Sequence, residues 1–467
     1  MAVFSVLALC FLALLYGAVS VHMRWWPSKL VADAGTAVTA LLAVQEEELK
    51  KNWPTSMEFI ETEGHTGLAV IEHAAAGTPG DDLIFVDGGS QQLRSHCPEN
   101  GCIAWLMDRQ GNIRHVWSIG PELIWSDLKN IEGFSRAENI YSVGAHPFAN
   151  GDLLVTYQGR NTYPYGVGMA RFDKDSNLLW KKENFAHHWF SVDSEGLIYV
   201  PAFQAVNTPY SLGDSNLRID CQGGKLQEDI ILVLDPDGNE LERVSLLDAI
   251  AASDYAGIVF QAVHSDRGLP LTYPECDPTH LNDVRLISSA DASTSDHLEA
   301  GDLLVSLRSN NAILVLDGTT REVKWASVGR TTLQHSPRYM GDNTVLVFDN
   351  LGGSELTGGT RLVRIDMDTN ETQVVFPQAA DEQADVLSVN GGYIALSEDR
   401  QRALMSLTRQ GRTLEIDLAT GRLLWEFRNV HDIRGIVDSP EGDFARFATQ
   451  TVNYFNQADF SFNEGRP

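Results

Sequence analysis

Basic residues are scarce in this sequence. Its 467 residues include 35 Lys and Arg against 63 Asp and Glu, which gives a formal net charge of -28 at pH 7. Phosphate binding needs a basic face, so this deficit argues against a nucleic-acid partner. The acidic excess favours a body that stays soluble outside the cytoplasm.

Cysteine is rare as well, with five in the chain, and the ligand spacings of zinc ribbons are absent. Cys10 lies in an apolar N-terminal run. The four other cysteines are Cys97, Cys102, Cys221 and Cys276. Cys97 and Cys102 bracket the short polar loop CPENGC, which a disulfide would close outside the cytoplasm. Cys221 and Cys276 are a second candidate pair, and four unpaired thiols are the alternative.

Charged residues are missing from residues 3–21, a run of 19 that reaches the lower end of what crosses a bilayer as a helix. A cleaved signal peptide is the alternative. Because no Lys or Arg precedes the run and no clear cleavage site follows it, we predict an uncleaved membrane anchor over residues 1–22. Arg24 and Lys29 follow the run, so the positive-inside rule alone would put the body in the cytoplasm. The cysteines favour a periplasmic or other extracytoplasmic body.

Beyond the predicted anchor, the sequence pattern changes from helical to β-rich. Residues 29–51 are rich in Ala, Leu, Glu and Lys without Pro, which predicts a helical stalk over residues 23–60. From there one pattern recurs six times: an apolar strand, an Asp turn and a second strand. The strand-ending aspartates are Asp108, Asp173, Asp235, Asp317, Asp366 and Asp417. This repeat predicts an all-β, six-bladed β-propeller over residues 61–455 and a tail over 456–467.

A second motif precedes each Asp-turn hairpin and predicts the second strand of each blade. Its six instances are DDLIFVDGG, GDLLVTYQG, EGLIYVPAF, GDLLVSLR, NTVLVFDN and GGYIALSED. After the sixth outer strand the chain continues with NVHDIRGIVDSPEGDFARFATQTVNYF. This segment either returns to complete the first blade or begins a seventh. We predict closure at six blades, because six outer hairpins can be counted.

Several of the 13 histidines fall at one repeat position, the start of an innermost strand. His188 and His335 align there without a gap, and the further candidates are His146, His280 and His431. A lone histidine is most often a hydrogen-bonded structural residue. A shared repeat position instead predicts several imidazoles around one channel mouth, with His187 pointing away from His188 by strand alternation. Such a set suits a nucleophile, an acid–base pair, or a zinc, copper or iron site.

Three runs resemble the bacterial-type arylsulfotransferases that work without a nucleotide sulfate donor. They are THLNDVRLI, GDLLVSLRSNNAILVLDGTTREVKW and LQHSPRYMGDNTVLVFDN. The resemblance covers residues 140–355 and rests on His-x-Asn-Asp, Ser-x-Arg, Gln-His and Phe-Asp-Asn in this order. It implies a six-bladed propeller with its site at the channel centre. An acidic insertion, STSDHLEAGD, departs from the family pattern between Asn282 and Arg308.

The resemblance also implies chemistry. A histidine attacks the sulfur of an aryl sulfate, a sulfohistidine forms, and a second phenol takes the sulfuryl group, with no dissociable cofactor. The implied catalytic residues are His335 as nucleophile with His280, His188, Arg308 and Asn282, and His146 and His431 are expected to bind substrate.

Two alternatives stay open from the residues: a non-catalytic surface propeller that binds a protein or glycan, and a metal-dependent enzyme that uses the same histidines. The sequence also leaves the oligomeric state open between a monomer and a homodimer.

Overall fold

The computed structural model divides the chain into two compact units, Met1–Trp53 and Pro54–Pro467. The residues that the structure describes are 2–23, 60–61, 69–72, 80–88, 104–118, 120, 124–128, 132–133, 140–159, 162–212, 218–221, 224–259, 277–353, 359–378, 386–432 and 444–460. The described residues of the second unit are mainly β-strands and the turns between them.

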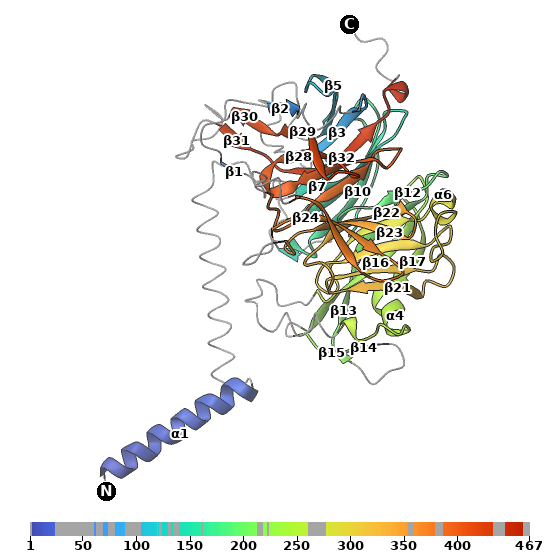
Figure 1. Cartoon of the computed structure of the whole chain (residues 1–467). Coiled ribbons are helices and arrows are strands. Elements are labelled where there is room, and N and C mark those ends of the chain that lie inside the picture. Colours follow the sequence, from blue (N-terminus) through green and yellow to red (C-terminus); the bar gives the residue numbers. More distant parts are fainter. Residues whose placement is uncertain are drawn as a thin grey trace. The chain divides into compact units, whose positions relative to one another are not determined.

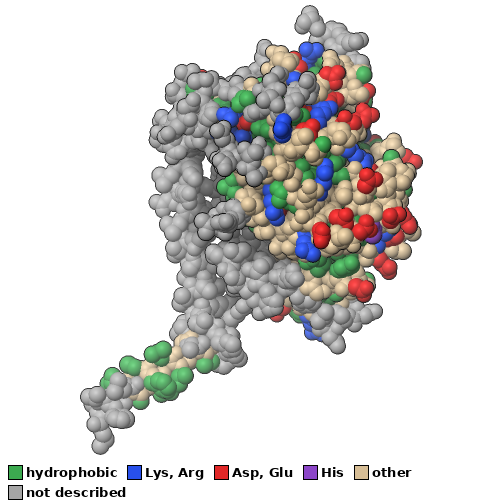
Figure 2. Space-filling model, viewed as in Figure 1, with side chains coloured by type: hydrophobic (Ala, Val, Ile, Leu, Met, Phe, Trp, Pro, Cys, Tyr) green, Lys and Arg blue, Asp and Glu red, His purple; other side chains and the backbone are tan. Residues whose placement is uncertain are grey.

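The first unit contains one described helix, α1 (Ala2–Met23), whose apolar side chains such as Leu9 and Leu14 are exposed (Figure 2). In the part of the chain that is described, no helix meets the length and apolarity needed to span a membrane, so the predicted transmembrane anchor is not supported. The predicted stalk over residues 23–60 lies almost wholly outside the described residues.

In the described part of the second unit, six antiparallel sheets form the blades of a propeller, five with four strands and one with five (Figure 1). The innermost strands are β32 (Thr449–Phe455), β7 (Ile140–Pro147), β12 (Ser191–Val192), β18 (Leu281–Leu286), β22 (His335–Gly341) and β26 (Tyr393–Leu396). The second strands are β3 (Leu83–Gly88), β8 (Leu153–Gly159), β13 (Ile198–Asn207), β19 (Leu303–Leu307), β23 (Thr344–Asp349) and β27 (Arg402–Leu407). The third strands are β4 (Ala104–Met107), β10 (Gly166–Phe172), β16 (Lys225–Leu234), β20 (Ala312–Leu316), β24 (Arg361–Asp366) and β28 (Arg412–Asp417). The outer strands are β5 (Ile113–Trp117), β11 (Leu178–Lys182), β17 (Glu240–Ser245), β21 (Val323–Val328), β25 (Thr372–Phe376) and β29 (Arg422–Arg428).

Smaller elements decorate the blades. The remaining strands are β1 (Ile60–Glu61), β2 (Ala69–Glu72), β6 (Glu132–Gly133), β9 (Thr162–Tyr163), β14 (Tyr210–Ser211), β15 (Arg218–Ile219), β30 (Val430–Asp432) and β31 (Phe444–Arg446). The short helices are α4 (Leu246–Ala251), α6 (Ser289–Ala292), η3 (Thr408–Gln410) and η4 (Gln457–Asp459). β2 extends the sixth blade outside β29.

The ring closes as predicted, because the last strand completes the first blade. β32 pairs antiparallel with β3, with Val452 opposite Val86. The seam between the first and sixth blades is tied by Arg109, which makes two hydrogen bonds to the buried Glu415 carboxylate at 2.7 and 3.0 Å. Six blades therefore account for the described propeller.

The predicted Asp turns join third and outer strands in all six blades. In the first, Asp108 accepts backbone N–H bonds from Gln110 and Asn112, which is the way a short side chain fixes a tight turn. The second-strand prediction is right for five motifs and wrong for GGYIALSED. That run forms the innermost strand β26, and RALMSL forms the second strand β27. Its length and apolar pattern suit either position, so the motif alone did not distinguish them.

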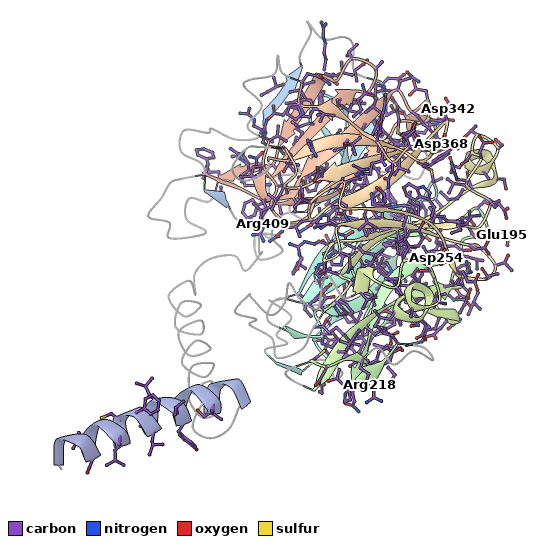
Figure 3. The ribbon with its side chains drawn as sticks, turned by 60° about the horizontal axis from the view of Figure 1, so that its bottom comes forward. Glu195, Arg218, Asp254, Asp342, Asp368 and Arg409 are labelled. Atoms are coloured by element: carbon purple, nitrogen blue, oxygen red, sulfur yellow. The ribbon has the colours of Figure 1, made fainter. Side chains whose placement is uncertain are left out.

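The innermost strands all run the same way, so the channel has two distinct ends. We call the end where these strands begin the near mouth and the end where they finish the far mouth. The turns at Glu195, Asp342 and Asp368 belong to the far mouth, whereas the connections at Arg409 and Arg218 belong to the near mouth (Figure 3). Loops between second and third strands therefore reach the near mouth together with the strand starts.

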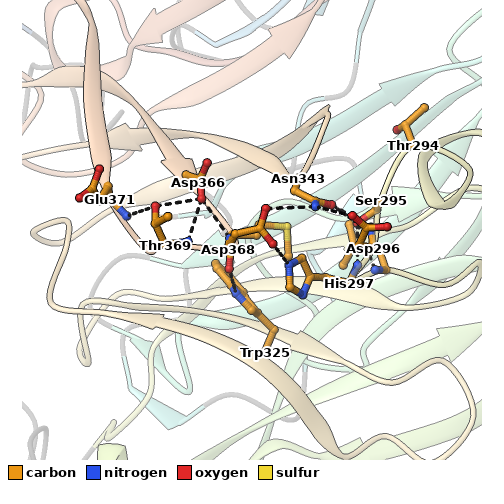
Figure 4. Close-up of polar contacts among 12 residues, drawn as sticks. Thr294, Ser295, Asp296, His297, Trp325, Asn343, Asp366, Asp368, Thr369 and Glu371 are labelled. Carbon is orange, nitrogen blue, oxygen red and sulfur yellow. Dashed lines mark hydrogen bonds and ion pairs between the residues drawn. The ribbon is translucent and has the colours of Figure 1, made fainter.

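The acidic insertion lies on the far-mouth side of the propeller. Asn343 Nδ2 donates to both Asp296 and Asp368 at 3.3 Å, and His297 Nε2 lies 2.6 Å from Asp368 Oδ1 (Figure 4). The insertion precedes β19 and Arg308 follows it, so the whole strand separates them. The insertion thus leaves the predicted position of Arg308 at the near mouth undisturbed.

Disulfide predictions are tested at one cysteine only. Cys221 is disulfide-bonded, whereas Cys97, Cys102 and Cys276 lie outside the described residues. The two proposed pairings stay predictions. Cys10 is a free, exposed thiol on α1.

Candidate active site

His335 begins β22 at the near mouth and is buried, with 2% of its surface exposed. Its Nδ1 lies 2.7 Å from Asn350 Oδ1. The Asn350 amide donates to the backbone carbonyls of Ser388 at 2.7 Å and Gly391 at 2.6 Å, so its oxygen must face the imidazole. His335 Nδ1 therefore carries the proton, and Nε2 keeps a free lone pair.

Burial lowers the pKa of His335 to about 3, and the positive charge of Arg308 adds to this shift. The ring is consequently neutral at physiological pH. A neutral imidazole whose unprotonated nitrogen is fixed in direction has the properties of a nucleophile.

Two buried amides hold the backbone that leads into His335. Gln334 donates through Nε2 to the carbonyls of Leu307 and Ala312, both at 3.0 Å. Asn282 donates through Nδ2 to the Gln334 carbonyl at 2.9 Å. Asn282 therefore fixes the start of β22 from the neighbouring blade, a positioning contact on the nucleophile's own backbone.

His280 stands beside this group and is paired with a carboxylate. Its Nδ1 lies 2.5 Å from Asp277 Oδ2, and its backbone N–H donates to the same side chain at 3.0 Å. The hydroxyl of Tyr165 lies 3.5 Å from the same ring nitrogen. About a fifth of the His280 side chain is exposed. An Asp-paired imidazole that solvent can reach is suited to proton transfer through Nε2.

His188 lies 5.3 Å from His280, measured between ring centroids. The prediction that His187 points away is wrong, since the Nδ1 atoms of His187 and His188 are 2.8 Å apart. His188 has a left-handed backbone with φ 51, as does His280, and this interrupts the strand alternation. Burial first, and then neighbouring imidazole charge, lowers the pKa of both His187 and His188 well below the usual value.

Arg308 supplies positive charge to the near mouth from the loop between β19 and β20. Its backbone N–H donates to the His280 carbonyl at 3.1 Å, and its Nη2 donates to Asn390 Oδ1 at 3.0 Å. Its charge lowers the pKa of both His188 and His335. The guanidinium therefore acts on the space that these rings share.

Aromatic rings form the floor beneath the nucleophile. The Trp189 ring meets His335 edge-on, with centroids 5.7 Å apart at an interplanar angle of 85°. Trp189 Nε1 donates to Thr451 Oγ1 at 3.0 Å. The centroid of the Tyr393 ring lies 5.7 Å from that of the Trp189 ring. The channel is thus filled by side chains just below the histidine group.

Two predicted residues lie apart from this group. His146 is near the end of β7 rather than its start, which puts it toward the far mouth against the Phe148 ring at 4.7 Å. His431 is buried on β30, where Nε2 lies 2.8 Å from Asn429 Oδ1 and the ring meets Phe447 at 5.1 Å. Neither residue contacts the His335 group among the described interactions. The structure therefore does not support the expectation that they bind substrate at the near mouth.

Sequence reasoning missed three members of the site. Asn350 belongs to the quoted Phe-Asp-Asn element, yet no role was assigned to it. Asp277 lies three residues before His280, a spacing that lets one side chain bind both the backbone and the ring of the histidine. Tyr165 comes from the loop between β8 and β10, which the blade order brings to the near mouth. Among the described residues, no group of three or more His, Cys, Asp or Glu side chains is arranged to hold a metal ion.

Comparison with known proteins gives one family match. The model of the arylsulfotransferase (ASST) family matches residues 145–430, which include the whole near-mouth group. No curated protein matches the chain.

Solved structures resemble the chain weakly. A protein of unknown function from Bacteroides caccae is 10% identical, with a TM-score of 0.43, over 80% of this chain and 99% of that chain. The Cps50 (Swd1) β-propeller domain of Myceliophteria thermophila is 10% identical, with a TM-score of 0.39, over 85% of this chain and 99% of that chain.

Proposed function

From the premise that this chain belongs to the arylsulfotransferase family, we propose that it transfers a sulfuryl group from an aryl sulfate to a phenol through a sulfohistidine at His335. The observation that carries the proposal is the hydrogen bond from His335 Nδ1 to the oriented Asn350 amide. It leaves Nε2 unprotonated on a neutral, buried ring, which is the state a histidine nucleophile needs.

In the first half-reaction, His335 Nε2 forms a bond to sulfur as the bond from sulfur to the aryl oxygen breaks. The departing aryl oxide takes a proton from Nε2 of His280, whose cation is stabilised by the Asp277 carboxylate at 2.5 Å. Negative charge on the sulfuryl oxygens is stabilised by Arg308. When His187 donates its Nδ1 proton to His188, His188 keeps its proton on Nε2 and donates it to a sulfuryl oxygen.

In the second half-reaction, the acceptor phenol gives its proton to His280 and its oxygen attacks the same sulfur. The bond from nitrogen to sulfur breaks, and its electron pair returns to His335 Nε2. Because the aromatic floor closes the channel below His335, donor and acceptor use the near mouth in turn. This order predicts ping-pong kinetics.

The experiment mixes the purified chain with 4-nitrophenyl sulfate and phenol and follows nitrophenol release. Intact mass, measured before the acceptor is added, detects a sulfuryl adduct. We expect turnover and one adduct in the wild type, and neither in His335→Asn. His146→Gln is the matched control, a half-buried histidine at the other end of a strand, and it should keep both. Absence of adduct and turnover with a panel of aryl sulfates would refute the proposal.

A further inference from the structure

The far mouth carries a cationic cluster that the proposed transfer does not use. Arg285 lies five residues after His280, and Arg338 lies three residues after His335. At about 3.3 Å per strand residue, their backbones stand roughly 10 to 16 Å along the channel from the near mouth. Both arginines arise from innermost strands, so both face one space at that end.

Positive charge exceeds negative charge within this cluster. Asp283 is fully buried and pairs with two guanidinium groups, Arg285 Nε at 2.6 Å and Arg338 Nη1 at 2.9 Å. Arg338 is only 9% exposed, and its Nη2 has no hydrogen-bond partner. Burial, followed by the neighbouring Arg285 charge, lowers the pKa of Arg338. Two cations thus share one carboxylate, and a buried donor is left unsatisfied, which is costly unless a ligand pairs with it.

A cavity of about 320 Å³ lies at this end, lined in part by Arg285, Arg338 and Arg400. Its walls also include Tyr339 and Leu396. Two acidic residues reach its rim. Asp291 is already paired with Arg400, and Glu398 is exposed. The one positive charge that Asp283 leaves unpaired is thus buried, whereas the carboxylate that could balance it, Glu398, is exposed and screened by solvent.

Aromatic rings separate this cavity from the nucleophile. The Tyr393 ring lies under both guanidinium groups, 4.7 Å from Arg338 Cζ and 5.4 Å from Arg285 Cζ. Tyr393 also meets Trp189, which in turn meets His335. A ligand in the cavity therefore does not share space with a substrate at His335.

We propose that the far-mouth cavity binds a small doubly charged oxyanion of the sulfate or phosphate type. Guanidinium groups hold such anions through charge-assisted hydrogen bonds from their planar N–H donors. One such anion would offset the single positive charge that Asp283 leaves unpaired and would supply an acceptor for Arg338 Nη2. The proposal goes beyond sulfuryl transfer and does not depend on it, because the two sites differ in every residue.

The test uses the full chain carrying His335→Asn and Arg308→Gln, which disable the near mouth. Sodium sulfate and sodium phosphate are titrated in separate calorimetric runs against a sodium chloride background. We expect one anion bound per chain. The ratio of the two affinities shows whether sulfate or phosphate is preferred.

Two added substitutions locate the bound anion. Arg338→Met should weaken binding at least tenfold, and Leu396→Trp should do the same by filling the cavity without changing charge. Arg171→Met is the control, because Arg171 also pairs with a carboxylate and covers an aromatic ring but lies outside the cavity. Absence of binding in the disabled chain would overturn the proposal. Unchanged anion affinity in Leu396→Trp would also overturn it. The Leu396→Trp measurement remains decisive even if Arg338→Met fails to fold.

Discussion

Replacing Asn350 by alanine tests whether the amide fixes the nucleophile. The substitution removes the acceptor from His335 Nδ1–H, which lies 2.7 Å from the Asn350 oxygen. In the sulfated ring this hydrogen bond becomes charge-assisted, and such a bond contributes about 1.5–3 kcal/mol. At about 1.4 kcal/mol per factor of ten, we expect kcat/KM for 4-nitrophenyl sulfate to fall roughly 10- to 150-fold.

The same substitution also removes donors from two carbonyls, those of Ser388 and Gly391. An unsatisfied buried polar group costs about 1–3 kcal/mol, so for two carbonyls unfolding in urea should show a loss of about 2–6 kcal/mol. A fall in activity could then reflect a smaller folded fraction. Rates are therefore compared per folded molecule, with the folded fraction taken from the urea curve at the assay temperature.

The chain supplies a matched control in Asn429. Its Nδ2 donates to the carbonyls of Phe447 and Ala448 at 3.2 and 3.3 Å, and its Oδ1 lies 2.8 Å from a buried histidine, His431. Asn429→Ala should therefore cost similar stability without affecting sulfuryl transfer. Equal losses of kcat/KM per folded molecule in the two variants would refute the reasoning about the His335 tautomer.

Two further predictions concern His280 and His431. Asp277→Asn should lower kcat far more for phenyl sulfate than for 4-nitrophenyl sulfate, because the poorer leaving group depends more on the proton from His280; equal losses would contradict that role. Burial lowers the pKa of His431 to about 4, whereas the unfolded chain takes up this proton below about pH 6.5. The contribution of neutral His431 to the free energy of unfolding is therefore fully present above pH 6.5 and is lost as the pH falls toward 4. Between pH 7 and pH 5, the wild type should lose about 2 kcal/mol more than His431→Gln in urea unfolding. Identical pH dependence would exclude His431 as the cause.

The fold was predictable because each blade repeats a local rule. An apolar strand ends in an aspartate whose carboxylate accepts the backbone N–H groups of the turn, and this happens at Asp108 and Asp235 alike. Closure followed from counting these turns. The sixth second strand was misassigned because GGYIALSED and RALMSL are both short apolar runs next to turns, and only the order of hydrogen bonding separates them.

The site was predictable only where the position of a histidine relative to the next turn was read correctly. His335 precedes its turn by a whole strand, so it lies at the near mouth. His146 comes just before the turn at Asn150 and Gly151, so the same rule puts it at the other end. That signal was present in the sequence. The contact between His187 and His188 was not predictable, because it depends on a left-handed backbone at a non-glycine residue.

The arrangement divides two roles between two imidazoles by giving them different hydrogen-bond acceptors. Asn350 presents a neutral amide oxygen to His335, which fixes the tautomer and stabilises a positive ring less than a carboxylate would. Asp277 presents a carboxylate to His280, which stabilises the cation that forms when the ring takes up a proton. A nucleophile must keep its lone pair, whereas an acid–base catalyst must gain and lose a proton. A protein can assign different roles to chemically identical side chains by giving them hydrogen-bond acceptors of different charge. The Asn350 substitution should therefore lower kcat/KM through the nucleophile, whereas the Asp277 substitution should lower kcat according to the leaving group.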